Sequence, residues 1–242
     1  MVGMVCGMMT VPSDAGLLLE SGMNELVVAS LLAGSLQVGE PGMIGVEYTV
    51  APGWHIYWEN PGQSGIPTEV SLGLPEGWEA GETLYPGPHW FMMPGDLVNY
   101  GYEGTVTLLV PVTVATPPAG TITAETRWLV CREEQCVPGR ASLELPLPAE
   151  AALDVDTAQQ HLPAPVPSEA VVQRSEQGLV VHLSGVTLSA IYPNTIAEPF
   201  IAQTAISDSH ARVWLNAPPQ EGSALIVQGE QDGVERFYRI EW

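Results

Sequence analysis

Glycine and proline are spread along the whole chain, and this feature restricts the fold more than any other. The 242 residues include 25 glycines and 22 prolines. Because both residues interrupt helices, long helices have little room, and short strands joined by turns are favoured. No apolar run reaches the roughly 18 residues that a membrane-spanning helix needs, so no such segment is expected.

Alternation of apolar and polar residues predicts strands between these turns. The segment at residues 42–50 is the clearest, because every second residue on one face is apolar. Similar patterns predict strands at residues 25–32, 54–58, 68–74, 105–114, 121–130 and 141–145. Residues 75–100, rich in proline, glycine and aromatic side chains, are expected to form a long ordered loop. Seven or eight strands are the number found in an immunoglobulin-like sandwich.

The chain as a whole is predicted to be all-β, with an immunoglobulin-like β-sandwich followed by a second, smaller β-domain. The sandwich is assigned to residues 24–148, and a leader or disordered arm to residues 1–23. Residues 149–168 are expected to be a proline-rich linker with a short helix. Residues 169–242 form the small β-domain, with short strands predicted at residues 170–173, 179–183, 212–215, 224–228 and 237–241.

The charge of the chain argues against one class of partner, and the motifs that it lacks argue against several kinds of chemistry. Its formal net charge is −21, so nucleic acid should repel it and is not expected as a partner. The sequence contains no Ser-His-Asp arrangement, phosphate-binding loop or paired metal-ligand motif. Hydrolase and kinase chemistry are therefore unsupported, and no metal or other cofactor is predicted.

Two of the three cysteines stand close together, whereas Cys6 lies near the N-terminus and no active role is expected for it. An apolar strand leads into Cys131, four polar residues turn the chain, and Cys136 begins the return. Facing positions in such a hairpin can bring two cysteines within bonding range. A loop this small gives a disulfide only about 2 kcal/mol of stabilisation. An exposed bridge that adds little stability is easily exchanged.

Other interpretations of the pair remain open at this point. A plain stabilising disulfide fits the spacing, whereas two thiolates without nearby ligands make an incomplete zinc site. Arg132 favours a thiolate, whereas Glu133 and Glu134 disfavour one, and no helix N-terminus is evident. A strongly activated attacking thiol is not indicated, and a pair that exchanges with a specific partner fits better.

Three stretches resemble the N-terminal periplasmic domain of DsbD-type thiol:disulfide interchange proteins, in particular the ScsB-like branch. They are Pro52–Gly62 (PGWHIYWENPG), Asn99–Glu103 (NYGYE) and Trp128–Pro138 (WLVCREEQCVP). They stand in the order found in the family and cover about residues 25–148. The continuation to Trp242 resembles the second β-domain of the ScsB-like branch.

The resemblance implies a sandwich that acts as a protein-disulfide reductase domain in the periplasm or outside the cell. Cys131 and Cys136 would be its catalytic redox pair, with Cys136 the more exchange-active. Thioredoxin-like periplasmic proteins would be its partners. A membrane electron-transfer domain, on the same or another polypeptide, would supply electrons. The ScsB-like branch is also associated with copper tolerance.

In the family a cap loop shields the cysteines, and by order along the chain it falls within Tyr85–Tyr100. Bulky groups there could exclude small oxidants from the bridge, although ordinary loop packing is the alternative. The candidate shielding residues are His89, Trp90, Phe91, Met92 and Tyr100, with Met93 beside them.

Aromatic and histidine residues elsewhere are expected to be structural. His55 is predicted to be a hydrogen-bonded strand residue. Core packing is expected of Trp54, Tyr57 and Trp58, and no role is assigned to His161, His182 and His210.

Two rival functions remain. One is a non-enzymatic binding module in which the bridge is a structural staple. The other is a copper-binding accessory protein that uses Cys131, Cys136, His89 or Met92, because sulfur and imidazole are copper ligands.

Overall fold

The structure, a computed structural model, describes residues 26–133, 135–150, 152–175, 178–194, 201–215 and 222–241. Side chains are described from residue 204 onward in the fifth of these ranges. The predicted leader or arm at residues 1–23, which contains Cys6, lies outside the described residues, and so does Glu134. Within these ranges, no helix combines the length and apolar character needed to cross a membrane.

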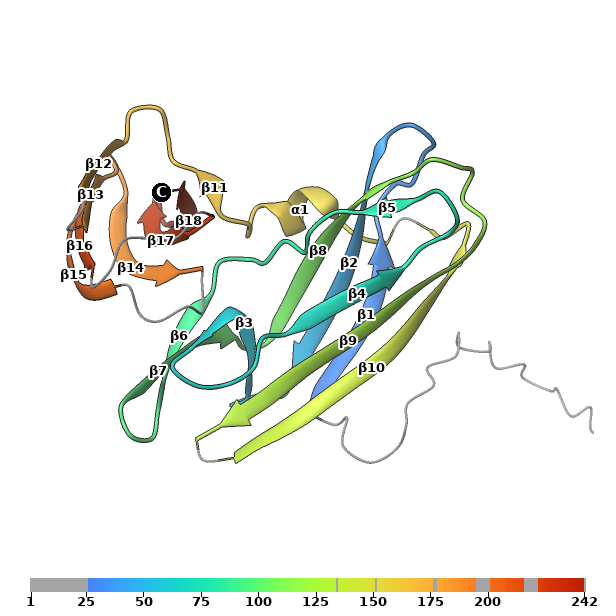
Figure 1. The fold of residues 1–242 in the computed structure, drawn as a ribbon, viewed down its shortest axis with the longest axis horizontal. Helices are drawn as coiled ribbons and strands as arrows, with labels where there is room; N and C mark the ends of the chain where they lie inside the picture. Colours follow the sequence, from blue (N-terminus) through green and yellow to red (C-terminus); the bar gives the residue numbers. More distant parts are fainter. Residues whose placement is uncertain are drawn as a thin grey trace, which may run out of the picture.

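Ten strands from the first part of the chain form two antiparallel sheets that pack face to face. They are β1 Val27–Ala33, β2 Pro41–Val50, β3 His55–Gly62, β4 Glu69–Gly73, β5 Glu79–Ala80, β6 His89–Met93, β7 Leu97–Tyr102, β8 Thr105–Thr113, β9 Gly120–Arg132 and β10 Gln135–Leu147. One sheet has the order β1-β2-β8-β5, and the other has the order β10-β9-β3-β7-β6, with β4 also paired to β9. This arrangement confirms the predicted immunoglobulin-like sandwich (Figure 1).

The long loop predicted at residues 75–100 is instead interrupted by strands. β5 and β6 lie wholly within it, and β7 begins within it. β6 pairs with β7, and β7 pairs with β3, which is far away in the sequence. Proline and glycine mark the turns here, including Gly95 at φ +86° in the β6–β7 turn. The partners across the sheet are not visible in the local pattern, which is why the strands escaped prediction.

The core of this sandwich lies between the inner faces of its two sheets. The face predicted for β2 is buried, with Ile44, Val46 and Tyr48 all at 0% exposure. Tyr48 meets Trp128 of the opposite sheet edge to face, with ring centroids 5.7 Å apart. Its hydroxyl group also hydrogen-bonds Thr126 Oγ1 across the core. Aromatic contact and a satisfied polar end let a tyrosine lie fully inside.

A glycine on β10 makes room for the largest side chain of β9. Gly139 pairs directly with Trp128 in the hairpin register. A Cβ at this position would collide with the indole ring of Trp128. Any other residue at position 139 would therefore push the tryptophan out of place.

A second, smaller β-domain follows, as predicted, and it is also a sandwich of two sheets. Its strands are β11 Ala164–Pro165, β12 Val171–Ser175, β13 Gly178–His182, β14 Thr187–Pro193, β15 Ile201–Ser207, β16 His210–Leu215, β17 Ala224–Gln231 and β18 Val234–Glu241. They form two four-stranded sheets, β11-β18-β17-β14 and β12-β13-β16-β15. A separate apolar core between these sheets includes Leu179, Val181, Leu183, Val213 and Leu225. The sequence pattern missed β14 and β15.

The segment between the sandwiches holds one short helix, α1 Val155–Gln159. It begins where Asp154 caps the backbone N–H of Thr157 through its carboxylate. β11 starts at Ala164, inside the range assigned to the linker, and pairs with β18. The boundaries at residues 148 and 169 stay predictions.

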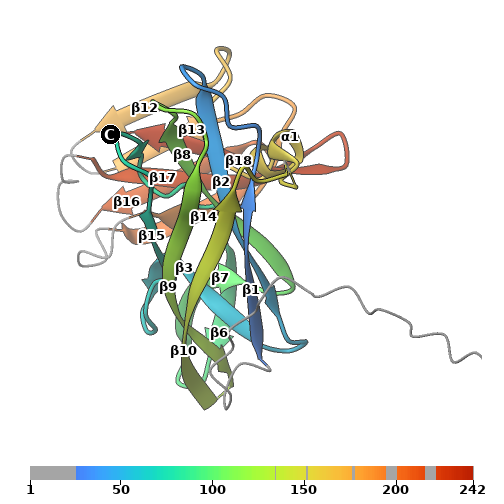
Figure 2. The same ribbon diagram turned by 90° about the vertical axis from the view of Figure 1, so that its right-hand side faces the viewer.

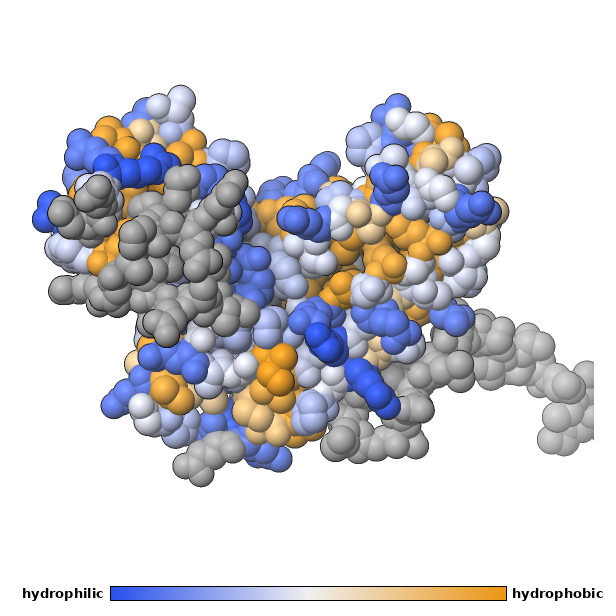
Figure 3. All heavy atoms as spheres, viewed as in Figure 1, coloured by the Kyte–Doolittle hydropathy of each residue, from blue (hydrophilic) through white to orange (hydrophobic). Residues whose placement is uncertain are grey.

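The second sandwich packs against the end of the first that carries β3, β6 and β7 (Figures 1 and 2). Asn60 Nδ2 donates a 2.7 Å hydrogen bond to the carbonyl oxygen of Pro193. The Tyr192 ring meets Trp58 and Tyr100 edge to face, at 6.3 and 5.3 Å between centroids. On the face seen in Figure 3, hydrophobic residues are interspersed with hydrophilic ones.

Candidate functional site: the cysteine bridge and its cover

The two cysteines face each other at the tip of the β9–β10 hairpin, as the sequence predicts. Cys131 and Cys136 are direct partners in the antiparallel register. A disulfide joins them, and their Cα atoms are 4.1 Å apart. This separation resembles the short one of opposed residues that exchange no backbone hydrogen bonds. The hairpin itself therefore positions the bridge.

The regular burial pattern of β9 ends at Cys131. Along the strand, even-numbered residues from Ile122 to Val130 face the core and are buried. Odd-numbered residues face away and are exposed or half-buried, up to Leu129. Cys131 belongs to this outer face, yet its exposure is 0%. Something must therefore cover the outer face of the sheet at this end.

The cover is provided by β3 and the β6–β7 hairpin. His55 pairs with Cys131 in the β3–β9 register. The Phe91 ring of β6 stacks on the His55 ring, with centroids 4.4 Å apart and planes 9° from parallel. Tyr57 and Met93 form a small buried cluster with Cys131. β3 is consequently buried on both faces from His55 to Trp58.

The two halves of the bridge differ in their access to solvent. Cys131 lies under the cover at 0% exposure, whereas Cys136 is exposed on β10. The Cys131 side of the bridge is therefore closed to solvent, whereas the Cys136 side is open. In a thiol–disulfide exchange, the sulfur that is not attacked is the leaving group. Cys136 is thus the more accessible half of the bridge, and Cys131 is the enclosed half.

His55 lacks, at one of its two ring nitrogens, the hydrogen bond expected of it. It is a buried strand residue, but its Nε2 atom has no hydrogen-bond partner among the described residues. Burial lowers the pKa of its imidazole to about 4. The ring is therefore neutral at physiological pH, unlike an exposed histidine, which is partly protonated.

Tyr57, beside Cys131, is held by a buried asparagine of β7. Asn99 is fully buried, and its Nδ2 donates to the Tyr57 hydroxyl oxygen at 3.3 Å. Its Oδ1 accepts from the backbone N–H of Ser64 at 3.0 Å. Asn99 thereby connects the cover to the loop after β3 and fixes the wall around the bridge.

Arg132, the residue after Cys131, is held by an aromatic ring. The Arg132 guanidinium sits over the Trp54 ring, 4.8 Å from its centroid. This contact holds the positive charge next to the hairpin tip. Glu133 occupies the turn with φ +42°. Glu134, which the sequence places there as a second negative charge, lies outside the described residues.

The predicted shielding residues do not all gather at the bridge. Phe91 does, through the His55 ring, whereas Trp90 and Met92 are exposed at 55% and 56%. His89 Nε2 lies 3.9 Å from a carboxylate oxygen of Glu235 in the second sandwich. Tyr100 contacts Trp58 and Tyr192 instead of the cysteines.

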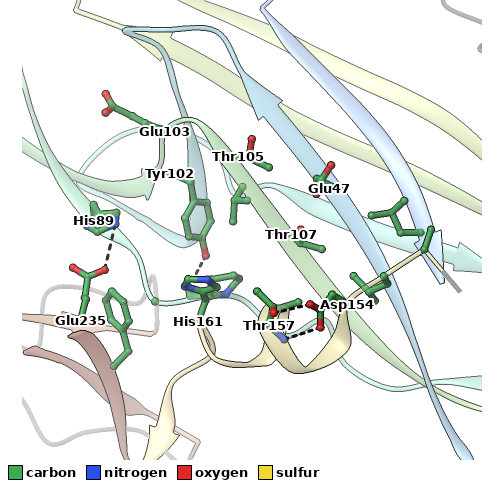
Figure 4. A pocket seen from close by; sticks show the side chains of 18 residues that line it. Glu47, His89, Tyr102, Glu103, Thr105, Thr107, Asp154, Thr157, His161 and Glu235 are labelled. Carbon is green, nitrogen blue, oxygen red and sulfur yellow. Dashed lines mark hydrogen bonds and ion pairs between the residues drawn. The ribbon is translucent and has the colours of Figure 1, made fainter. Parts of the chain in front are cut away.

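His89 also lines a cavity of about 420 Å³ between the two sandwiches. Figure 4 shows Glu235 facing His89 on one side and Asp154 with Thr157 on another. The cysteines are not among its lining residues. In the described part of the chain, no group of three or more histidine, cysteine, aspartate or glutamate side chains could hold a metal ion.

Sequence reasoning did not assign Tyr57, Asn99 or Leu129 to the site. A signal for two of them was present, because residues two apart on a strand share a face. Leu129 precedes Cys131 by two positions, and Tyr57 follows His55 by two. Asn99 carried no signal beyond lying in a matching stretch.

Comparison with known proteins supports this description of the molecule. A family model described as "Thiol:disulfide interchange protein DsbD, N-terminal" matches residues 28–148, half of the 242-residue chain. The match includes both bridged cysteines. No curated protein sequence matches the chain.

Among solved structures, the N-terminal periplasmic domain of ScsB from Proteus mirabilis is similar in fold. It matches with a TM-score of 0.67 and 18% identity, covering 92% of this chain and 96% of that one. The CupB2 chaperone of Pseudomonas aeruginosa matches with a TM-score of only 0.21 and 8% identity, covering 87% of this chain and 99% of its own. The ScsB match extends the likeness in fold beyond residue 148 into the second sandwich. The chain belongs to the family of DsbD N-terminal domains of thiol:disulfide interchange proteins.

Proposed function

We propose that the chain passes reducing equivalents to partner proteins by thiol–disulfide exchange at Cys131 and Cys136. The observation that carries the proposal is the unequal exposure of the two halves of the bridge, 0% for Cys131 against an exposed Cys136. A structural staple needs no such difference. An exchange site needs one sulfur that a partner can reach and one that stays behind to resolve the intermediate.

The first step uses the reduced pair. The Cys136 thiolate attacks one sulfur of a partner's disulfide, and the partner's S–S bond breaks. The partner's other sulfur leaves with the electron pair and takes a proton from water. The product is a mixed disulfide between Cys136 and the partner.

The second step re-forms the internal bridge. The Cys131 thiol loses its proton to water, and its sulfur attacks the Cys136 sulfur. The mixed disulfide breaks, and the partner's second sulfur leaves as a thiolate. This thiolate then takes a proton from water. Counting the proton that Cys136 released when it formed its own thiolate, the partner has gained two electrons and two protons, and Cys131 and Cys136 have lost them. The hairpin register keeps the two sulfurs in position for this closure.

A dithiol must then restore the reduced pair by the same steps in reverse. We assign this role to a thioredoxin-like protein or to a membrane electron-transfer domain on the same or another polypeptide. The periplasm is the proposed compartment. Disulfides persist in oxidising compartments, and the similar ScsB domain is described as periplasmic.

The cover at the bridge supports a gated exchange. Phe91 and Met93 approach the outer face from the β6–β7 hairpin, above His55 and Cys131. Only Phe91 of the five predicted shielding residues takes part directly. Small oxidants therefore meet a site in which the sulfur on β9 is enclosed.

Single-cysteine variants test the proposal. With Cys6 replaced by serine throughout, Cys131→Ala leaves the exposed thiol and Cys136→Ala leaves the buried one. The probe is a purified thioredoxin-like protein that keeps one active-site cysteine, activated as its mixed disulfide with thionitrobenzoate. The Cys131→Ala variant should displace thionitrobenzoate and form a covalent complex at least about tenfold faster than Cys136→Ala.

Two results would count against the proposal. No complex with either variant means that the bridge is a structural staple. Equal rates mean that the difference in exposure does not direct the reaction.

A further inference from the structure

The strongest unexplained feature near the bridge is the unpaired ring nitrogen of His55. Buried polar atoms in folded proteins almost always have a hydrogen-bond partner. Among the described residues, buried side-chain atoms without one are His55 Nε2, Trp58 Nε1 and Thr68 Oγ1. Only the first belongs to a residue on the same face as the cysteines. An orphaned nitrogen at a reactive site calls for a functional explanation.

The surroundings of His55 offer this nitrogen few partners. Phe91 covers one face of the ring and presents only carbon. Tyr57 approaches edge to face at 5.2 Å, and its hydroxyl oxygen already accepts from Asn99. Cys131 is the neighbour across β9, on the same face of the sheet. Side chains directly opposed on neighbouring strands have Cβ atoms about 5 Å apart, within reach of an imidazole.

In the oxidised state the Cys131 sulfur is a poor partner, because a disulfide sulfur carries no proton and little negative charge. Opening the bridge changes this. The sulfur on β9 leaves with the electron pair and becomes a thiolate beneath the cover of β3 and the β6–β7 hairpin. An unsolvated thiolate is unstable unless a donor reaches it. A neutral imidazole N–H is such a donor.

We propose that His55 donates a hydrogen bond from its ring nitrogen to the Cys131 sulfur when the bridge opens. The inference rests on the proposed function and adds to it the group that stabilises the leaving sulfur. His55 gives up no proton in this step and is neither oxidised nor reduced. A thiolate of the electron-donating dithiol protein attacks Cys136 and forms a mixed disulfide with it, the S–S bond of the bridge breaks, and the electron pair goes to Cys131.

The charges around His55 suit a neutral donor. Among the described residues, the titratable groups beside it are Tyr57 on its own strand, Cys131 on β9 and, beyond that, Cys136 on β10, whereas Phe91 of β6 adds no charge. Burial is the single cause that lowers the imidazole pKa, to about 4. The ring therefore stays neutral across the range in which exchange operates.

Two substitutions separate hydrogen bonding from packing. His55→Phe keeps an aromatic ring for the stack on Phe91 but removes the nitrogen. His55→Gln loses the ring but keeps an N–H near the original position. The reduction equilibrium of each variant is measured against dithiothreitol. His55→Phe should shift it about tenfold towards the bridged form, equivalent to about 30 mV. His55→Gln should lie closer to the wild type.

The control is His182→Phe, the same exchange on strand β13 of the second sandwich, where His182 stacks on His210 at 4.1 Å. It should leave the equilibrium unchanged. Equal values for wild type and His55→Phe, or an equal shift in His55→Phe and His55→Gln, would overturn the inference.

A measurement on the unaltered protein covers the case in which His55→Phe does not fold. Nitrogen-15 NMR of the imidazole ring should show a change at Nε2 of His55 on reduction and none for His182. An unchanged His55 signal contradicts the inference. Exchange of the wild type with the thioredoxin-like probe is measured separately. Failure of the proposed function would abolish this exchange, whereas failure of the His55 inference alone would leave it intact.

Discussion

The inner face of strand β9 is buried along most of its length, whereas its outer face is exposed at one end and covered at the other. Towards the end of β9 that begins with Gly120, the outer side chains of Glu125 and Arg127 are open to solvent. At the other end the outer face is covered, and Cys131 is buried although it continues the same alternation. The inner face is a continuous core throughout, from Ile122 to Val130.

Because of this difference, we expect one face of β9 to determine the stability of the sandwich and the other to determine the reactivity of the disulfide. A buried inner face is what any two-layer sandwich requires. The covered outer face is an addition, made by folding the β6–β7 hairpin over β3, and it is present where the disulfide lies. Substitutions on the inner face should therefore change the free energy of unfolding. Substitutions under the cover should change the chemistry of the bridge.

The largest effect on stability is expected from the inner face. Trp128→Ala removes a buried ring that contacts Tyr48 and fits against Gly139. Loss of such a ring costs about 3–5 kcal/mol of unfolding free energy. Urea unfolding measures this loss, and the rate at which glutathione attacks the folded protein should stay near the wild-type value. A loss below about 1 kcal/mol would break the distinction between the faces.

The next effect concerns a carboxyl group further along β3, beside the second sandwich. Burial raises the pKa of Glu59 to about 7 from its ordinary 4.5, even though Arg239 opposes the shift. Between these pH values the folded state binds more protons than the unfolded state, so stability falls as pH rises and the decrease is complete above about pH 7.

Glu59→Gln should remove this pH dependence. Unfolding free energies at pH 5 and pH 8 should differ less in the variant than in the wild type, by up to about 3 kcal/mol. Urea titrations at the two pH values provide the comparison. If the wild type and the variant lose the same unfolding free energy between pH 5 and pH 8, Glu59 is not desolvated as described.

Phe91 tests the cover itself. Phe91→Ala removes the ring stacked on His55 and should expose the Cys131 side of the bridge. Because Phe91 is only half-buried, the stability loss should be about 2 kcal/mol, below that of a core aromatic residue. Reduction of the bridge by glutathione should become about tenfold faster.

Trp90→Ala is the matched control for Phe91, because Trp90 is its neighbour on β6 and is 55% exposed. It should leave the reduction rate unchanged. An equal acceleration in both variants would mean that general loosening of the β6–β7 hairpin, not loss of the ring over His55, opens the site.

The smallest effect is expected on the open end of β9. Arg127 forms an ion pair with Glu69 of β4, with side chains 70% and 44% exposed. Exposed ion pairs contribute about 0–1 kcal/mol. Arg127→Ala should therefore change neither stability nor bridge reduction beyond that amount, as thermal unfolding and glutathione assays can show. A change in the rate of bridge reduction would mean that the exposed end of β9 influences the chemistry at its covered end.

The sequence predicts the sandwich well because local patterns determine most of it. The alternation of apolar and polar residues predicts β2 and β9 without a structure, and glycine and proline predict the turns. The cysteine hairpin is predicted in the same way, from an apolar strand followed by a polar turn. β7 was missed because it pairs with β3, about forty residues earlier, and β6 was missed with it because β6 joins the sheet through β7. Proline and glycine at residues 75–100 mark real turns, but they hide the short strands between them.

The candidate site is less predictable than the fold. The cysteines and Phe91 could be named from the sequence, yet the contact between Phe91 and His55 depends on how the sheet curls. Trp90 and Met92 look equally suited to shielding, but both lie on the exposed face of β6 because side chains alternate between the two faces of a strand. The unpaired nitrogen of His55 is a product of this tertiary cover and has no trace in the local sequence.

The reduction potential of the Cys131–Cys136 bridge tests the central claim most directly. The protein, with Cys6 replaced by serine, is equilibrated in glutathione buffers and the bridged fraction is quantified by mass spectrometry after alkylation. An exchange-active bridge should have a potential between about −280 and −180 mV, in the range of thioredoxin-like proteins. A potential below about −300 mV would identify a structural disulfide and contradict the proposed function.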